Sequence, residues 1–374
     1  MKVLVLTAKF GMGHMSASNA VKERIEKYNR DADVEVIDFY NYVLPASSKY
    51  IYRGFSFIIK NMKNIYSNYY LESDKEKNVD LFSRFLARGL KKLVAEKQPD
   101  MIVSTFPAIS KAVGHFKRSE GSSIELVTCI TDISSHYEWI DEDTNTYIVP
   151  CEEVKTDLIR KGVDSNKIRV YGIPVSMKYI ENNIKLGNKI TRKKIVHLSK
   201  YRSDKEVLIM GGGLGVLPTE KKFYDRLHSI KNTHFTIVTG ENKALYDLLK
   251  DRYENITVVG YTNEVAKLME KADCVLTKPG GITVFEAIYS LTPIISFSTT
   301  LPNEVRNINF IIDNNFGIAL SGSPDVSIDR IVRFINSSNV LNSMQISMNK
   351  FVKSLDNTYF DNITGVEEYI EEEI

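Results

Sequence analysis

Two side chains of this sequence stand where they can react with a ligand, each shortly after a glycine-rich turn. His14 follows FGMG, and Glu286 lies in the helix that begins within KPGGITVF. An imidazole titrates near neutral pH and can take a proton from a hydroxyl group. A carboxylate can accept two hydrogen bonds from neighbouring hydroxyls such as those of a ribose. These residue types predict proton transfer at the first turn and nucleotide binding at the second.

Both glycine-rich turns in the second half of the chain suit a phosphate. In MGGGLGVLP, the glycines after the apolar run that ends at Met210 let backbone N–H groups come close to an anion. This pattern is neither a P-loop nor GxGxxG, so a tight turn without a ligand stays open as the alternative. In TKPGGITVFEA, a helix that starts near Ile282 presents free N–H groups and its positive dipole end, with the Thr283 hydroxyl beside them. The second turn therefore predicts a diphosphate site.

Alternating strand and helix patterns must position these turns. Apolar, β-branched runs alternate with helical periodicity twice along the chain, which is typical of two parallel-sheet α/β units. The first set of predicted strands comprises residues 2–7, 34–38, 101–105, 124–131, 146–149 and 168–171. The second set comprises residues 207–210, 235–239, 256–259, 274–277, 294–297 and 318–320. Within the first set, a helix is predicted whose apolar face holds Phe82, Phe85, Leu86, Leu90, Leu93 and Val94. Because α/β proteins bind ligands at the carboxyl ends of such strands, we expect His14 to face a crevice.

Length and composition narrow the class of protein. A chain of 374 residues exceeds one ordinary core and predicts two domains. A net charge of +2 gives no general indication of nucleic-acid binding. Cys129, Cys151 and Cys274 lie in or beside apolar runs, as reduced, buried thiols of a cytosolic protein do. The apolar runs are too short to predict a signal peptide or a membrane span.

An aromatic and basic stretch occupies residues 45–97. Ten Phe or Tyr residues lie between positions 39 and 70, and residues 49–97 hold 11 Lys or Arg against five Asp or Glu. One interpretation is a helical insertion that packs its rings on the first domain and leaves its lysines in solvent. The other is a membrane-associating surface, with rings at headgroup depth and anionic lipid attracted by cations such as Lys60, Lys63, Lys91 and Lys92.

Six motifs together resemble a known family. They are FGMGH, TDISSHYEW, GIPV, MGGGLGVLP, TKPGGITVFEA and LPNEVRNINF. Their order and approximate spacing resemble those of the motifs in the monogalactosyldiacylglycerol synthase and processive diacylglycerol glucosyltransferase group. More distantly, the chain is similar to the lipid-linked N-acetylglucosaminyltransferase of peptidoglycan synthesis, and these enzymes belong to glycosyltransferase family 28. The likeness extends from residue 1 to about residue 345.

This resemblance implies a fold and an activity. The fold would be GT-B, in which two Rossmann-like, doubly wound α/β domains face a central cleft. The activity would be inverting transfer of a hexose from a UDP-sugar to a membrane lipid acceptor such as diacylglycerol or a glycosyl-diacylglycerol. Such enzymes need no metal, so we expect the UDP-sugar and the lipid as partners and no cofactor.

The same resemblance implies roles for individual residues. Catalytic roles go to His14, or to His136 with Asp132 to orient it, and acceptor contacts go to Gly11, Gly13 and Trp139. The residues matched to the UDP-sugar donor are Gly211, Gly212, Gly213, Thr239, Gly240, Tyr261, Val265, Pro279, Gly280, Gly281, Thr283 and Glu286. The hexose-contacting motif is one residue shorter than that of the family and reads PNEVRN, which leaves as candidates Asn303, Glu304 and Asn307. The identity of the donor hexose therefore stays open.

The resemblance also implies a domain layout and a location. We expect an acceptor-binding domain at residues 1–180 that includes the insertion, a linker at 181–204, a donor-binding domain at 205–345, and a helical segment at 346–374 that returns to the first domain. The protein would be cytoplasmic and peripherally attached to the anionic inner face of the cell membrane. Two alternatives stay open: transfer to a polyprenyl-linked or soluble glycan, and a non-catalytic, UDP-sugar-responsive membrane-binding protein.

Overall fold

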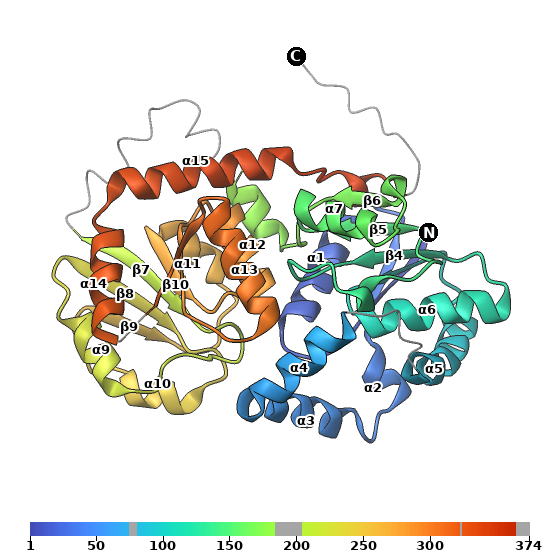
Figure 1. Ribbon diagram of the computed structural model, residues 1–374, viewed down its shortest axis with the longest axis horizontal. Helices are drawn as coiled ribbons and strands as arrows, with labels where there is room; N and C mark the ends of the chain where they lie inside the picture. Colours follow the sequence, from blue (N-terminus) through green and yellow to red (C-terminus); the bar gives the residue numbers. More distant parts are fainter. Residues whose placement is uncertain (75–80, 184–203, 322–323, 364–374) are drawn as a thin grey trace, which may run out of the picture. The chain divides into compact units, whose positions relative to one another are not determined.

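The computed structural model describes residues 1–74, 81–183, 204–321 and 324–363, and these form two compact units. The first unit comprises Met1–Phe10, His14–Met177 and the chain from Leu355 onward. The second comprises Gly11–Gly13 and Lys178–Ser354. Most of the predicted linker and the last 11 residues of the predicted C-terminal segment lie outside the described residues. Figure 1 colours the first unit mainly blue to green and the second mainly yellow to red.

Each unit contains one six-stranded, parallel sheet. The first has the order β2-β1-β3-β4-β5-β6, and its strands are β1 Lys2–Thr7, β2 Asp33–Asp38, β3 Met101–Ser104, β4 Glu125–Cys129, β5 Thr146–Val149 and β6 Ile168–Val170. The second has the order β12-β11-β10-β7-β8-β9, and its strands are β7 Lys205–Met210, β8 Thr233–Val238, β9 Ile256–Val259, β10 Cys274–Thr277, β11 Ile294–Ser296 and β12 Gly317–Ala319. Every strand end lies within two residues of its prediction. The predicted α/β class with two doubly wound sheets is confirmed.

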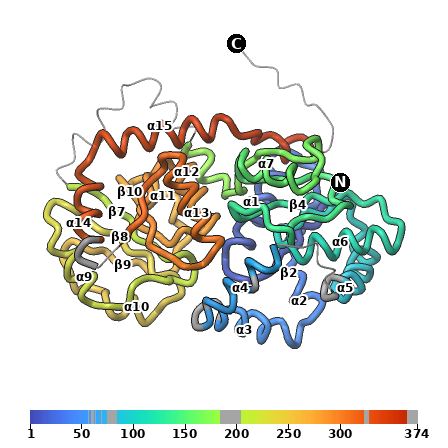
Figure 2. The backbone as a smooth tube through the Cα atoms, viewed as in Figure 1, coloured from blue at the N-terminus to red at the C-terminus, as the bar shows by residue number. Residues whose placement is uncertain are grey.

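Helices cover both faces of the first sheet, as a parallel sheet requires. They are α1 Gly13–Tyr28, α2 Phe39–Val43, α3 Ser48–Asn61, α4 Lys63–Ser73, α5 Leu81–Lys97, α6 Pro107–Glu120 and α7 Glu152–Arg160, with short 3₁₀ turns at Tyr137–Trp139, Ser165–Lys167 and Tyr359–Asp361. Successive β1 side chains alternate between the faces: Leu4 packs in a cluster with Leu90 of α5, and Val5 packs in another with Val21 of α1. Figure 2 shows α2, α3 and α4 in blue as consecutive coils of one backbone stretch.

The prediction for the apolar face of α5 is wrong at one residue, Phe85. The helix buries Leu86 and Leu90, whereas Phe85 is 43% exposed. Adjacent residues of an α-helix point about 100° apart, so Phe85 lies beside the buried stripe instead of within it. The side chain of Phe82 lies outside the described residues.

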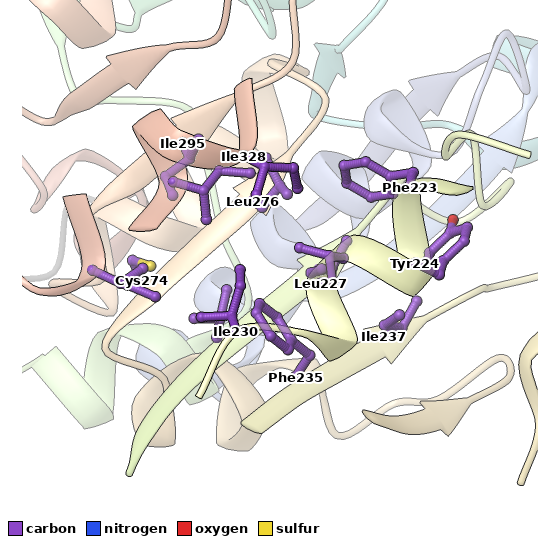
Figure 3. Close-up of a cluster of buried hydrophobic side chains, with 14 of the residues drawn as sticks. Phe223, Tyr224, Leu227, Ile230, Phe235, Ile237, Cys274, Leu276, Ile295 and Ile328 are labelled. Atoms are coloured by element: carbon purple, nitrogen blue, oxygen red, sulfur yellow. The ribbon is translucent and has the colours of Figure 1, made fainter. Parts of the chain in front are cut away.

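The second sheet is likewise packed between helices. These are α9 Lys221–His228, α10 Lys243–Leu249, α11 Val265–Lys271, α12 Gly281–Tyr289, α13 Pro302–Asp313, α14 Pro324–Ile335 and α15 Ser338–Ser354. In the core cluster of Figure 3, Leu227 of α9 and Ile328 of α14 pack with Phe235 of β8 and Leu276 of β10. The strands that carry the second pair of glycine turns are therefore fixed by a continuous apolar core.

Each sheet has a point at which the strand order reverses. In the first sheet the chain moves from β1 to β2 on one side and then to β3 on the other, so the reversal lies between β1 and β3. In the second sheet it lies between β7 and β10. Open α/β sheets bind ligands outside the carboxyl ends of the strands at such a point. His14 follows β1, and the glycine turns after Met210 and Thr277 follow β7 and β10.

Candidate functional site

His14 lies in the first turn of α1 and reaches across to the carboxyl ends of neighbouring strands. Its Nδ1 lies 2.9 Å from the Thr105 carbonyl oxygen, after β3, and 2.9 Å from the Thr131 hydroxyl, after β4. Gly11 in the preceding turn has φ of +88°, a conformation that favours glycine. The turn thus places the imidazole at the point of strand reversal in the first sheet.

These hydrogen bonds determine which nitrogen of His14 can accept a proton. A carbonyl oxygen only accepts, so Nδ1 carries the hydrogen that it donates to Thr105. The lone pair then resides on Nε2. Burial lowers the pKa of the imidazole to about 4, and the hydrogen bond to the Thr105 carbonyl opposes that change only in part. The ring is therefore neutral at pH 7 and holds a proton-accepting Nε2.

The structure gives His136 a different environment. The side chain is buried, Nε2 donates to the Tyr70 carbonyl at 2.9 Å, and Nδ1 accepts the backbone N–H of Glu138 at 3.1 Å. Both ring nitrogens are thus engaged in joining α4 to the 3₁₀ turn at Tyr137–Trp139. This is the geometry of a structural histidine, because neither nitrogen is presented to a substrate.

The other predicted site residues of the first unit differ in how deeply their side chains are buried and in where they lie. Trp139 is buried in the core, and Asp132 is partly buried directly after Thr131. Gly13 is the first residue of α1, directly before His14. Of the predicted catalytic set, Asp132 and His14 therefore lie close to the same strand end, because Thr131 itself contacts His14.

In the second unit, two of the predicted donor turns touch through their backbones. A side chain on Gly240, which has φ of +54°, would meet the Gly213 carbonyl oxygen at 2.3 Å. The backbone N–H of Glu241 donates to that same carbonyl at 3.0 Å. A side chain on Gly211 would meet the backbone of Val216 at 2.5 Å. Glycine is thus required sterically where the turns after β7 and β8 meet.

The third donor turn, Pro279 to Gly281, begins α12. Gly280 caps the helix in an extended conformation, and a side chain added there would meet nothing within 4 Å. The amide of Asn307, on α13, donates to the Pro279 carbonyl at 2.8 Å and is fully buried. Thr283 lies in the first turn of the helix. The N-terminus of α12 therefore has open space beside it, and the buried Asn307 amide holds the turn that precedes it. Such a helix N-terminus can bind an anion.

Glu286 lies farther along α12, and the pKa of its carboxyl group is raised. Burial raises the pKa of its carboxyl group to about 7, and a hydrogen bond from Tyr179 lowers it by less. The carboxylate and its protonated form are therefore both populated near neutral pH. The sequence provided no reason to single out Tyr179, which lies just before the predicted linker.

The three candidate hexose residues on α13 are a glutamate that forms an ion pair and two asparagines. Glu304, whose side chain is 6% exposed, pairs with Lys278 and accepts a hydrogen bond from Thr299 at 2.6 Å. The buried Oδ1 atoms of Asn303 and Asn307 have no hydrogen-bond partner among the described residues. The sequence missed Lys278, although its place directly before Pro279 in TKPGG could have identified it.

The predicted uracil-reading residues lie after β9, at the edge of the same sheet. Tyr261 is 60% exposed, and Val265 begins α11 and is partly buried. An exposed ring is available to stack on a planar base. Thr239, buried, connects this edge to the glycine turns, because its backbone N–H donates to the Val259 carbonyl at 2.8 Å.

Helices α3 and α4 combine inward rings with outward apolar groups. Tyr52 and Phe55 pack edge-on against Phe10, which confirms that part of the aromatic stretch covers the domain. Other large apolar side chains of the two helices and of the residue between them are exposed, and we call them the apolar surface of α3–α4: Tyr50, Phe57, Ile58, Met62, Ile65 and Leu71. The side chains of Lys60 and Lys63 lie outside the described residues, whereas Lys91 pairs with Glu120.

Two further properties of the described ranges concern membranes and metals. None of the helices in them combines the length and apolar character needed to cross a bilayer. Within the same part of the chain, His, Cys, Asp and Glu side chains do not gather in groups of three or more that could hold a metal ion.

Two sequence comparisons agree on one family, and a comparison with solved structures shows the fold. The family described as Monogalactosyldiacylglycerol (MGDG) synthase matches residues 14–175. The chain is 29% identical over 354 residues to the processive diacylglycerol beta-glucosyltransferase of Bacillus subtilis, covering 92% of this chain and 89% of that one. It is 30% identical over 319 residues to the enzyme of the same name from Bacillus cytotoxicus, covering 82% and 78%. MurG of Acinetobacter baumannii has a similar fold, with a TM-score of 0.62 at 13% identity over 98% of this chain and 100% of that one.

Proposed function

This chain belongs to the family of the diacylglycerol glucosyltransferases and monogalactosyldiacylglycerol synthases, and we propose that it transfers a hexose from a UDP-sugar to diacylglycerol or a glycosyl-diacylglycerol. The family assignment and the GT-B fold predicted from the motifs are confirmed. The observation that carries the proposal is the arrangement in the second unit, where the glycine turns flank the strand reversal and Glu286 follows within α12.

The proposed reaction is a direct displacement with inversion. The acceptor hydroxyl oxygen forms a bond to the anomeric carbon while the bond from that carbon to the diphosphate breaks, and UDP leaves with the electron pair. The hydroxyl proton passes to Nε2 of His14. A neutral imidazole whose Nδ1–H is fixed by Thr105 suits that role. His136 is the weaker candidate because both its nitrogens are already bonded.

The charge of the leaving diphosphate needs compensation in the absence of a metal. The N-terminus of α12 supplies backbone N–H groups and a partial positive charge. Lys278, one residue before the turn, adds a full positive charge that is at present balanced by Glu304. The unpartnered amide oxygens of Asn303 and Asn307 supply acceptors for hexose hydroxyls. We therefore propose a donor site that uses no cofactor.

The proposed location is the anionic inner face of the cell membrane. The apolar surface of α3–α4 exposes Phe57 by 59% and Ile65 by 57%, and exposed cations such as Lys49 and Arg53 lie on the same helices. Rings and aliphatic groups that enter the headgroup region, with basic residues beside them, give reversible attachment. A lipid acceptor would then be reached without a membrane-spanning helix.

One experiment tests the function as a whole. The protein is incubated with vesicles that contain diacylglycerol and with UDP-glucose, UDP-galactose or UDP-N-acetylglucosamine in turn, and the lipids are analysed by mass spectrometry. A glycosylated diacylglycerol that is absent with Glu286→Ala supports the proposal. Transfer only to a polyprenyl-linked or soluble glycan, or UDP-sugar binding with no product from any acceptor, would contradict it.

A further inference from the structure

The hydroxyl group of Thr131 lies against the candidate base. Its Oγ1 is 2.9 Å from Nδ1 of His14, and Thr131 is only 5% exposed. The Thr105 carbonyl oxygen lies 2.9 Å from the same nitrogen. Thr105 follows β3 and Thr131 follows β4, so the two oxygen atoms reach Nδ1 from neighbouring strands. The hydrogen on Nδ1 therefore has two oxygen atoms within reach.

This arrangement favours one tautomer of the His14 ring. If the hydrogen were on Nε2, the lone pair of Nδ1 would face the lone pairs of the Thr105 carbonyl oxygen at 2.9 Å, which is repulsive. With the hydrogen on Nδ1, both oxygen atoms can accept it in a three-centre hydrogen bond. A hydroxyl group has two lone pairs, so Thr131 can accept in this way.

We propose that Thr131 is a positioning residue for the proposed reaction, whose hydroxyl fixes the plane of the His14 ring while Nε2 takes the proton of the lipid hydroxyl. This inference rests on the proposed function, because that function assigns the base to His14. A single hydrogen bond lets the ring turn about the bond, whereas two acceptors on different strands define a plane. When Nε2 takes the proton, Nδ1 keeps its hydrogen, and the positive charge of the ring strengthens both hydrogen bonds.

The buried surroundings of His14 increase the effect of this contact. Burial lowers the pKa of the ring to about 4, so the imidazolium that forms during transfer is costly there. A hydrogen bond stabilises a charged group more than a neutral one, so the Thr131 hydroxyl should stabilise the protonated ring more than the resting ring. Its removal should therefore lower kcat and leave nucleotide affinity unchanged.

The atoms that surround Nδ1 are themselves held in place. The Ser18 hydroxyl, 2.9 Å from Oγ1 of Thr105, donates to the His14 carbonyl at 2.8 Å. Oγ1 of Thr105 lies 3.0 Å from the Thr7 hydroxyl, and Thr105, Ser18 and Thr7 are buried. The residue before Thr131 donates its backbone N–H to a carbonyl of β5 at 2.9 Å. The position of the Thr131 hydroxyl is therefore fixed by the sheet.

The experiment compares two variants with a matched control. Thr131→Val has nearly the same shape and lacks the hydroxyl, whereas Thr131→Ser keeps it. Thr128→Val is the control, because Thr128 is a fully buried residue of β4 whose hydroxyl lies 3.1 Å from that of Thr144. Transfer to diacylglycerol vesicles is measured with whichever of UDP-glucose, UDP-galactose and UDP-N-acetylglucosamine gives product, and UDP affinity is measured by calorimetry.

The expected result is a loss of kcat without a loss of nucleotide binding. In Thr131→Val, kcat should fall about tenfold or more, because a hydrogen bond to a charged group is lost. Its UDP affinity should equal that of the wild type. Thr131→Ser should recover most of the kcat, and Thr128→Val should keep it.

Nuclear magnetic resonance reads the hydrogen on Nδ1 directly. In protein labelled with ¹⁵N-histidine, the His14 ring should carry its hydrogen on Nδ1, in signals that His14→Ala lacks. In Thr131→Val, the Nδ1 proton should resonate upfield and exchange faster with water, because one of its two acceptors is gone. Thr128→Val should leave both properties unchanged.

The outcomes separate the two levels of inference. A wild-type kcat in Thr131→Val refutes the role of Thr131, and so does a Thr131→Ser protein that is as slow as Thr131→Val. If His14→Ala keeps full activity, the base itself is misassigned and the proposed mechanism fails. If no UDP-sugar gives product but the Nδ1 proton responds as expected, the proposed function fails and the positioning of the ring by Thr131 stands. If Thr131→Val does not fold by circular dichroism, Thr131→Ala takes its place in the same comparison.

Discussion

Replacing His14 with Ala should separate the two halves of the proposed reaction. Nδ1 donates to the Thr105 carbonyl, which leaves Nε2 as the proton acceptor. A positioned general base contributes about 10²–10⁴-fold, so kcat should fall by that factor, or about 3–5 kcal/mol of transition-state stabilisation. The affinity for UDP should stay within about twofold of the wild type, because the candidate donor residues lie in the other unit.

The pH dependence adds a second readout for the same substitution. With a pKa of about 4, His14 stays neutral well below its ordinary value of 6.5, so kcat at saturating donor should hold until the pH approaches 4. Folding stability also depends on the protonation of His14. The unfolded state takes up a proton first as the pH falls below about 6.5, so the contribution of His14 is present above that pH and is lost down to about pH 4. The two pKa values correspond to about 3 kcal/mol.

The assay combines radiolabelled hexose transfer to diacylglycerol vesicles with calorimetry of UDP and thermal unfolding from pH 4 to 7. His115→Ala, a histidine of the same unit on α6, is the control and should keep activity. Full activity in His14→Ala together with loss of activity in a folded His136 variant would refute the assignment of the base. Loss of UDP binding in His14→Ala would contradict the assignment of nucleotide binding to the second unit.

Three further substitutions test the surroundings of the site. His136→Gln should lower the melting temperature, because a buried hydrogen bond worth about 1 kcal/mol is lost, while kcat below the transition changes little. Lys278→Met should weaken UDP binding about tenfold and destabilise the fold by leaving Glu304 buried and charged; adding Glu304→Gln should restore the melting temperature but not the affinity, as calorimetry and thermal unfolding can show. Phe57→Ser should reduce binding to anionic vesicles several-fold in a flotation assay, whereas Val340→Ser, at an exposed apolar residue of α15, should not.

The strands and glycine turns could be predicted because their determinants are local. Each strand is a short apolar run, and each turn shows glycine where the backbone takes positive φ or touches another backbone, as at Gly11, Gly211 and Gly240. The order of strands in the sheets then follows from parallel α/β topology. Those signals suffice to place His14 and the donor turns at strand reversals. They do not predict that Phe85 is exposed, because its exposure depends on how α5 packs on the sheet.

The partners of a side chain were not predictable in the same way. His14 and His136 look equivalent in sequence, each near polar residues after a strand, yet one keeps an acceptor nitrogen and the other uses both nitrogens for structure. The difference arises from the Thr105 and Tyr70 carbonyls, which backbone folding supplies and no residue type encodes. Tyr179 is a comparable case, because its contact with Glu286 joins positions 107 residues apart.

Glu304 shows why matching a motif by position is weaker than matching an environment. The family pattern places it against the donor hexose, but here one oxygen pairs with Lys278 and the other accepts from Thr299. A carboxylate already engaged on both oxygens recognises hydroxyls poorly, whereas the amide oxygens of Asn303 and Asn307 each lack a partner and would gain one from a sugar hydroxyl. If sugar selection depends on these amides, Asn303→Ala should change the ratio of kcat/KM between UDP-glucose and UDP-galactose, while Glu304→Gln should alter UDP affinity through Lys278 and leave that ratio unchanged.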